Sequence, residues 1–98
     1  MLENFSFEKN KRTIIIALKL PDTKEFDFYN SIEEMRLLAL TLGLEVLNIF
    51  TQKRDKIEPD FFLGRGKLEE IKKYKNENRI ESAIFDNELT GVQERNLE

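Results

Sequence analysis

One stretch decides the fold: Thr13-Ile14-Ile15-Ile16-Ala17-Leu18-Lys19-Leu20, an almost continuous apolar run rich in β-branched residues. A strand that is covered on both faces has this composition, whereas a strand with one solvated face alternates apolar and polar residues. The run therefore predicts the central strand of a parallel sheet. Pro21 ends it, and the acidic, aromatic stretch at 22–30 is predicted to be a loop.

A helix is predicted over about 31–42, because Ser31 and Glu34 have the spacing of a capping box. Its apolar face would carry Ile32, Met35, Leu38, Ala39 and Leu42. Gly43 then suits the left-handed residue that commonly follows a helix. The remaining predicted elements are a strand at 44–50, a helix from Lys67 to about 77, a strand at 80–86, and a helix that opens at Thr90 and continues to residue 98.

The predicted element order is β-α-β-α-β-α, with connections long enough for parallel pairing. Right-handed crossovers then give an α/β fold in which a small three-stranded parallel sheet, in the order 2-1-3, is flanked by helices. Residues 1–98 are expected to form one domain, since a chain of this size buries a single core. An open edge of the sheet would allow self-association.

Composition excludes several classes of function. The 98 residues include no Cys and no His, so the chain offers no disulfide, thiolate nucleophile, imidazole base or zinc site. The absence of Cys and of an N-terminal secretory pattern predicts a cytoplasmic protein. The longest apolar run, at 14–18, is too short to span a membrane.

Charge is distributed unevenly along the chain. The net charge is −3, yet residues 51–79 contain nine Lys and Arg against six Asp and Glu. Within this segment a basic cluster, Lys53, Arg54 and Lys56, precedes the turn Gly64-Arg65-Gly66-Lys67, which opens the second predicted helix. Because the loops that follow parallel strands and the N-termini of the helices gather at the carboxyl end of the sheet, these residues predict an anion site.

Simpler interpretations of the same residues remain open. The two glycines would equally permit a tight turn with Lys67 in solvent. The turn is not a Walker A loop, because Leu68 follows Lys67, nor a dinucleotide motif, because Glu69 replaces the third glycine. Acidic residues at strand ends (Asp86 and Glu88, with Asp22 or Asp27) could bind magnesium, but Asx turns account for them as well. Phe61 and Phe62 could stack on bases or anchor a loop on the core.

Four blocks of the chain resemble the amino-terminal domain of the HflX family of ribosome-associated GTPases. They are Thr51-Gln52-Lys53-Arg54-Asp55-Lys56, Phe62-Leu63-Gly64-Arg65-Gly66-Lys67-Leu68-Glu69-Glu70, Phe85-Asp86-Asn87-Glu88-Leu89 and Gln93-Glu94-Arg95-Asn96-Leu97-Glu98. The resemblance implies a domain that precedes a helical linker and a G domain and that contacts the large ribosomal subunit and its rRNA. GTP and magnesium would belong to the G domain, and ATP binding by the N-terminal part is reported for some members.

The resemblance also implies which residues matter. It marks Lys53, Arg54, Gly64, Gly66 and Lys67, together with a strand-end motif of Gln52, Asp55, Asp86, Glu88, Leu89, Gln93, Arg95 and Asn96. With Lys56 and Arg65, which the basic segment adds, Lys53, Arg54, Gly64, Gly66 and Lys67 are expected to contact phosphate or RNA. Arg65 departs from the family, which usually has a small or hydroxylated residue between the glycines.

Three functions follow as hypotheses. The first is a regulatory domain that contacts the ribosome, and the second is an adenine-nucleotide site at the Gly64–Lys67 turn. The third is a structural module for docking or dimerisation. GTP hydrolysis is not expected of these residues, which contain no Walker A lysine and serine and no guanine-reading motif. No catalytic residue and no metal ligand is assigned.

Overall fold

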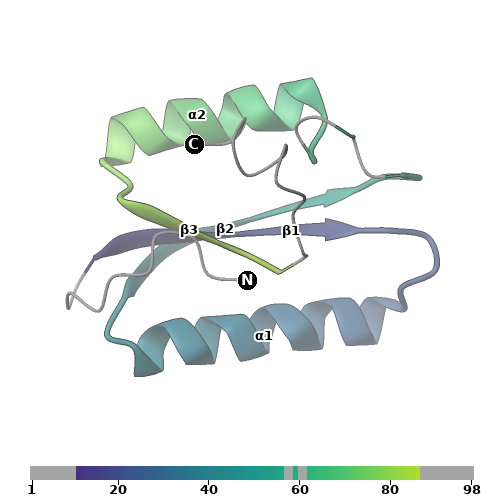
Figure 1. The fold of residues 1–98 in the computed structure, drawn as a ribbon, viewed down its shortest axis with the longest axis horizontal. Coiled ribbons are helices and arrows are strands. Elements are labelled where there is room, and N and C mark those ends of the chain that lie inside the picture. Colours follow the sequence, from purple (N-terminus) through teal and green to yellow (C-terminus); the bar gives the residue numbers. More distant parts are fainter. Residues whose placement is uncertain (1–10, 57–58, 60–61, 87–98) are drawn as a thin grey trace.

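The structure is a computed structural model that describes residues 11–56, 59 and 62–86. It contains β1 (Arg12–Lys19), α1 (Glu25–Thr41), β2 (Glu45–Lys53), α2 (Arg65–Asn78) and β3 (Ser82–Phe85). The strands form one parallel sheet in the order β2-β1-β3, with α1 on one face and α2 on the other (Figure 1). The predicted α/β class and strand order are confirmed, and the helix predicted from Thr90 lies outside the described residues.

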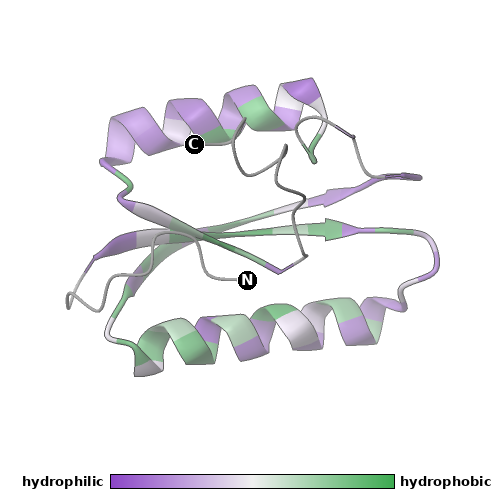
Figure 2. Ribbon diagram, in the orientation of Figure 1, coloured by the Kyte–Doolittle hydropathy of each residue, from purple (hydrophilic) through white to green (hydrophobic). Residues whose placement is uncertain are grey.

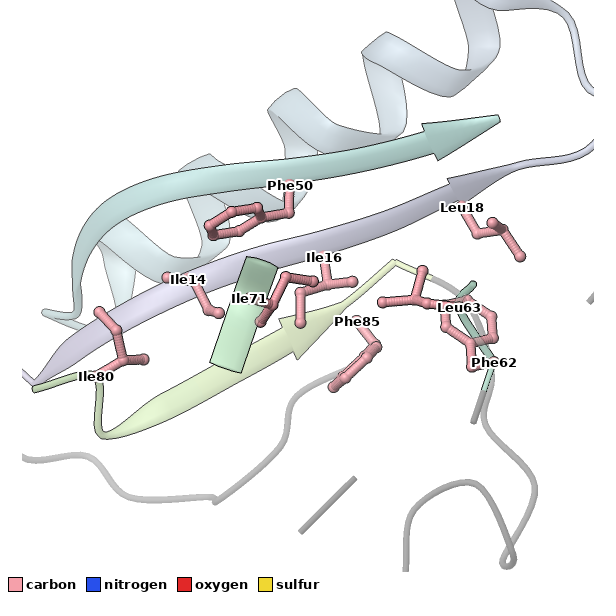
Figure 3. Close-up of a cluster of buried hydrophobic side chains, with 9 residues drawn as sticks. All are labelled: Ile14, Ile16, Leu18, Phe50, Phe62, Leu63, Ile71, Ile80 and Phe85. Atoms are coloured by element: carbon pink, nitrogen blue, oxygen red, sulfur yellow. The ribbon is translucent and has the colours of Figure 1, made fainter. Parts of the chain in front are cut away.

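The sheet separates two halves of the core, and β1 contributes to both. Ile14, Ile16 and Leu18 face α2, where they pack with the buried side chains drawn in Figure 3: Phe50, Phe62, Leu63, Ile71, Ile80 and Phe85. Ile15 and Ala17 face α1 and pack with Ala39, Leu44, Ile84, Phe28 and Ile32. Burial on both faces explains why the sequence of β1 is a continuous apolar run.

Helix α1 begins six residues before the predicted start, so the predictions of a loop at 22–30 and of a capping box at Ser31 are wrong. A turn closed by Thr23 N–H on the Leu20 carbonyl (3.1 Å), with Pro21 inside it, leads into a helix whose N-cap residue is Lys24. Phe28, which is buried against Ala17 and Ile32, extends the apolar face by one turn. Ser31 therefore lies within the helix.

The end of α1 agrees with the prediction. Gly43 has a φ of 79°, and its N–H donates to the Leu40 carbonyl at 3.0 Å. The N–H of Leu44 donates to the Ala39 carbonyl at 2.9 Å, which completes a Schellman motif. The side chains of Ala39 and Leu44 also share a core cluster, as this motif favours.

The later elements differ from their predicted bounds in ways that affect the site. Strand β2 continues through Thr51, Gln52 and Lys53, which were predicted to lie beyond the strand. Helix α2 begins at Arg65, so Gly66 belongs to its first turn, and β3 covers only residues 82–85. Phe62 is fully buried in the core, which confirms the loop-anchor interpretation for this residue and leaves no ring surface for stacking on a base. Neither described helix is long and apolar enough to cross a membrane.

Candidate functional site

The candidate site lies at the carboxyl end of the sheet, where β1 and β2 end and α2 begins (Figure 1). The β1–β2 pairing reaches Lys19 and Lys53, and the N–H of Arg54 then donates to the Lys19 carbonyl at 3.0 Å. The polar motif therefore starts on ordered strand rather than on a loop. Because successive side chains of a strand point to opposite faces, β2 distributes this motif between the two helices.

Gln52 and Arg54 face α2. The Gln52 Oε1 atom accepts a hydrogen bond of 2.9 Å from the N–H of Gly64, the N-cap residue of α2. A Cβ atom built on Gly64 would overlap Nη1 of Arg54, so the guanidinium lies directly against this glycine. Gly64 has a φ of −65°, which any residue adopts. A side chain at this position would therefore meet the flexible ends of Arg54 and Gln52, which would have to move aside, and no backbone strain.

The first turn of α2 carries cations and no acidic residue. Its N-cap makes no side-chain hydrogen bond to the exposed amides. Arg65 is exposed, while Lys67 is partly buried and its Nζ lies 3.2 Å from a carboxylate oxygen of Glu70. No atom lies within 4 Å of a Cβ built on Gly66. We call Gln52, Arg54, Gly64 and the first turn Arg65–Lys67 the α2 entrance; its helix dipole and cations both favour an anion.

Lys53 points the other way, toward α1. Its Nζ lies 2.6 Å from Oε1 of Glu25 in an exposed ion pair. The hydrogen bond and the charge of Lys53 lower the pKa of Glu25, and Glu25 in turn raises the pKa of Lys53. The basic cluster expected at 53–56 is therefore divided, because Lys53 pairs with α1 while Arg54 lies at the α2 entrance.

Asp86 also lies on the α1 side. Its N–H donates to the Ile16 carbonyl at 3.0 Å, and its Oδ1 accepts a 2.6 Å hydrogen bond from the Ser31 hydroxyl. Within the described ranges, no three Asp or Glu side chains gather closely enough to hold a metal ion. The Asp86 carboxylate instead links β3 to α1.

The other predicted site residues are placed as follows. Asp55 and Lys56 follow β2 and are exposed. Glu88, Leu89, Gln93, Arg95 and Asn96 lie outside the described residues. Sequence reasoning missed Glu25 and Ser31 as partners of the motif, because both were assigned to a loop or a cap. The signal was present: continuing the alternation of β2 past Phe50 places Gln52 and Arg54 on one face and Lys53 on the other.

We predict opposite effects of alanine at the two glycines. Gly66→Ala should raise the free energy of unfolding by about 0.5–1 kcal/mol, because alanine is the better helix former and meets no neighbour here. Gly64→Ala should lower it by about 1 kcal/mol, because the guanidinium of Arg54 must move and alanine is a poorer N-cap than glycine. Urea unfolding of both variants measures this difference. Equal effects would contradict the different positions of the two glycines, one at the N-cap against Arg54 and one inside the first turn of α2.

The chain is similar to known proteins of one family. Residues 29–98 match the family model described as GTP-binding GTPase N-terminal. The chain is 39% identical to a GTPase HflX from Flavobacterium psychrophilum over 97% of its own length and 22% of that protein. It is 33% identical to a GTPase HflX from Caldanaerobacter subterraneus, over 99% of the chain and 22% of the relative. It is 26% identical to a GTPase HflX from Escherichia coli, over 94% of the chain and 21% of the relative. The chain thus spans about a fifth of the length of these relatives.

Proposed function

Because this chain belongs to the HflX family of GTPases and corresponds to the N-terminal domain, we propose that it is a non-catalytic domain that contacts RNA of the large ribosomal subunit. In the whole protein it precedes a helical linker and a G domain, which binds GTP and magnesium in the cytoplasm. The nucleotide state of the G domain then regulates how this domain engages the ribosome.

The α2 entrance carries this proposal. Arg54 lies against Gly64, Arg65 and Lys67 belong to the first turn of α2, and the N-cap glycine has no side chain to bond the amides of that turn. Cations and amides held on ordered elements bind a phosphate backbone without reading its sequence, which suits a fixed contact on rRNA. Lys53 and Lys56 extend the basic surface along the end of β2. The exposed Lys53–Glu25 pair contributes little to stability, so Lys53 can exchange its partner for a phosphate.

Co-sedimentation with purified large ribosomal subunits across a salt series tests the proposal. Binding should weaken as salt rises, since phosphate contacts release counterions. The double variant Lys53→Ala/Arg54→Ala should reduce the magnitude of the log–log salt slope by about 2, because each of the two cations neutralises one phosphate.

A matched control is available on the same helix. Lys72→Ala/Lys73→Ala removes the same charge from exposed positions in the middle of α2, about 12 Å along the helix from Gly64. This control should leave the slope within about 0.5 of the parent value. An identical reduction of the slope in both double variants would mean that only net charge matters, and no binding at low salt would remove the RNA contact from this domain.

An adenine-nucleotide site at the α2 entrance is the second candidate, because the cations and free amides of the first turn of α2 would suit the phosphates of a nucleotide as well. No atom of the described structure lies within 4 Å of a Cβ built on Gly66. A larger side chain at this position would therefore block a bound nucleotide without clashing with the rest of the domain. A saturable titration with ATP and magnesium that Gly66→Val abolishes would support nucleotide binding. Absence of heat or signal up to millimolar ATP would dismiss it.

A further inference from the structure

The large apolar side chains that are exposed in the described part of the chain all lie on α1, and they are of two kinds. Figure 2 shows green, apolar segments along this helix, whereas α2 is mostly purple. Three leucines, Leu37, Leu38 and Leu40, lie in its second half. Two rings, Phe26 (79% exposed) and Tyr29 (52%), lie in its first half, which begins at the carboxyl end of the sheet (Figure 1). Aromatic rings in water are therefore confined to the end of the sheet that carries the candidate site.

The two rings are neighbours on the surface of α1. Phe26 and Tyr29 are three residues apart, a spacing that brings side chains together on a helix. At about 100° per residue, Phe26 points about 160° away from the buried Phe28, and Tyr29 lies between these two directions. The ring of Tyr29 packs edge-on against the ring of Phe28, with 5.1 Å between the centroids. The core thus holds one of the two exposed rings in place.

Cations at the ends of two strands adjoin these rings. The Nζ atom of Lys53 lies 2.6 Å from Oε1 of Glu25, which is one helical turn before Tyr29 on the same flank of α1. Glu25 is the main cause of the raised pKa of Lys53, and Tyr29 adds to it, so the phenol lies near the same ammonium group. Lys53 is also the main cause of the lowered pKa of Glu25, to which Lys19 at the end of β1 contributes. Ring faces and ammonium groups are therefore contiguous here.

Acidic side chains on this flank of α1 are paired. Glu25 is bound to Lys53, and the two carboxylate oxygens of Glu33 accept hydrogen bonds of 2.6 and 2.9 Å from Arg36. Asp27 points about 100° away from Phe26 around the helix. If Lys53 exchanges Glu25 for a phosphate, Lys19 remains close to the Glu25 carboxylate. The surface beside the rings is thus compatible with a polyanion.

A ring beside a cation suits an unpaired nucleotide, because the base stacks on the ring while the phosphate meets the cation. We propose that Phe26 and Tyr29 form a stacking platform for an unpaired base of ribosomal RNA, next to the phosphate contact of Lys53. The RNA strand would pass around the end of β2, from Arg54 on the α2 side to Lys53 and the rings on the α1 side. The platform takes the role that the sequence suggested for Phe62, whose ring is buried.

This inference rests on the proposed function and deepens it. Phosphate contacts position a protein on any RNA backbone, whereas stacked bases favour loops and bulges over a duplex. An apolar contact between α1 and another protein segment would make a different prediction: rings and leucines would then act alike, and leucine could replace phenylalanine. Stacking requires an aromatic face, so only the rings should matter.

Co-sedimentation with purified large ribosomal subunits across a salt series distinguishes these cases. Phe26→Ala should lower the affinity at least about fivefold at every salt concentration, as expected when one stacked base is lost. The log–log salt slope should keep its parent value, because a ring neutralises no phosphate. Phe26→Leu should lose as much affinity as Phe26→Ala, and Phe26→Trp should bind at least as tightly as the parent chain.

Leu40→Ala is the matched control, since Leu40 is 63% exposed and lies about 21 Å along the same helix from Phe26. It should bind like the parent chain, and circular dichroism of each variant checks folding. Parent-like binding by Phe26→Leu overturns the proposal, and so does an equal loss in Leu40→Ala and Phe26→Ala. Affinity that depends on the ring but not on salt would keep the platform and contradict the phosphate contacts, and a parent chain that does not bind removes both.

Discussion

Phe62→Ala should lower the free energy of unfolding by about 3–5 kcal/mol, a large fraction of the total stability of a domain of this size. The ring of Phe62 is fully buried and meets Phe85 edge-on, with 6.0 Å between ring centroids (Figure 3). It lies with Leu63 between the end of β2 and the start of α2, so its removal opens a cavity beside the α2 entrance. Urea unfolding monitored by circular dichroism measures the change.

The backbone at this position supplies a more selective test. Phe62 has a φ of 72°, a left-handed conformation that costs a non-glycine residue about 1–2 kcal/mol. Phe62→Gly removes the same ring and also this strain. Glycine usually destabilises relative to alanine, but here the glycine variant should be at least as stable as the alanine variant. A decrease below about 1 kcal/mol in Phe62→Ala would contradict core packing, and an alanine variant clearly more stable than the glycine variant would contradict the left-handed backbone.

Leu38→Ala is the matched control for Phe62→Ala. Leu38 was predicted on the core face of α1 but is 41% exposed there. Its truncation should lower the free energy of unfolding by less than about 1 kcal/mol, because much of the side chain is not enclosed by other residues. The comparison separates the effect of burial from the effect of removing any large apolar side chain.

The sequence was most informative where burial acts on both faces of an element. The run at 13–20 identified β1 as central, and the order β2-β1-β3 followed from that. Gly43 was equally clear, since a left-handed residue after a helix has few alternatives. In both cases one physical requirement limits the sequence directly, so a local pattern is sufficient.

Prediction failed where a distant contact decides the local structure. The spacing of Ser31 and Glu34 fits a capping box, yet the Ser31 hydroxyl bonds Asp86, a residue 55 positions later. The start of α1 depends on Phe28 being buried beneath β1. The division of the candidate site has a local cause instead: β2 continues through Lys53, so strand alternation places Lys53 and Arg54 on opposite faces, and Glu25 then pairs with Lys53 on the α1 side.

A buried pair of hydroxyl groups holds β1 and β3 in register. Thr13 and Ser82 are register partners, both are buried, and their hydroxyl oxygens lie 2.9 Å apart. The Thr13 hydroxyl donates its proton to the Lys11 carbonyl at 2.9 Å. A hydroxyl has one proton, so Ser82 must be the donor in the pair and Thr13 the acceptor. Ser82 therefore needs Thr13 as its acceptor, whereas Thr13 keeps its bond to the Lys11 carbonyl without Ser82.

That inequality predicts a non-additive double-mutant cycle. Thr13→Val should lower the free energy of unfolding by about 1–3 kcal/mol, because it leaves the Ser82 proton buried without its acceptor. Ser82→Ala should cost less, since Thr13 keeps its bond to Lys11. In the double variant no unpaired hydroxyl remains, so its decrease in stability should be smaller than the sum of the two single decreases by about 0.5–2 kcal/mol. Additivity within about 0.3 kcal/mol would mean that the two hydroxyls do not interact, and that apolar packing alone sets the β1–β3 register.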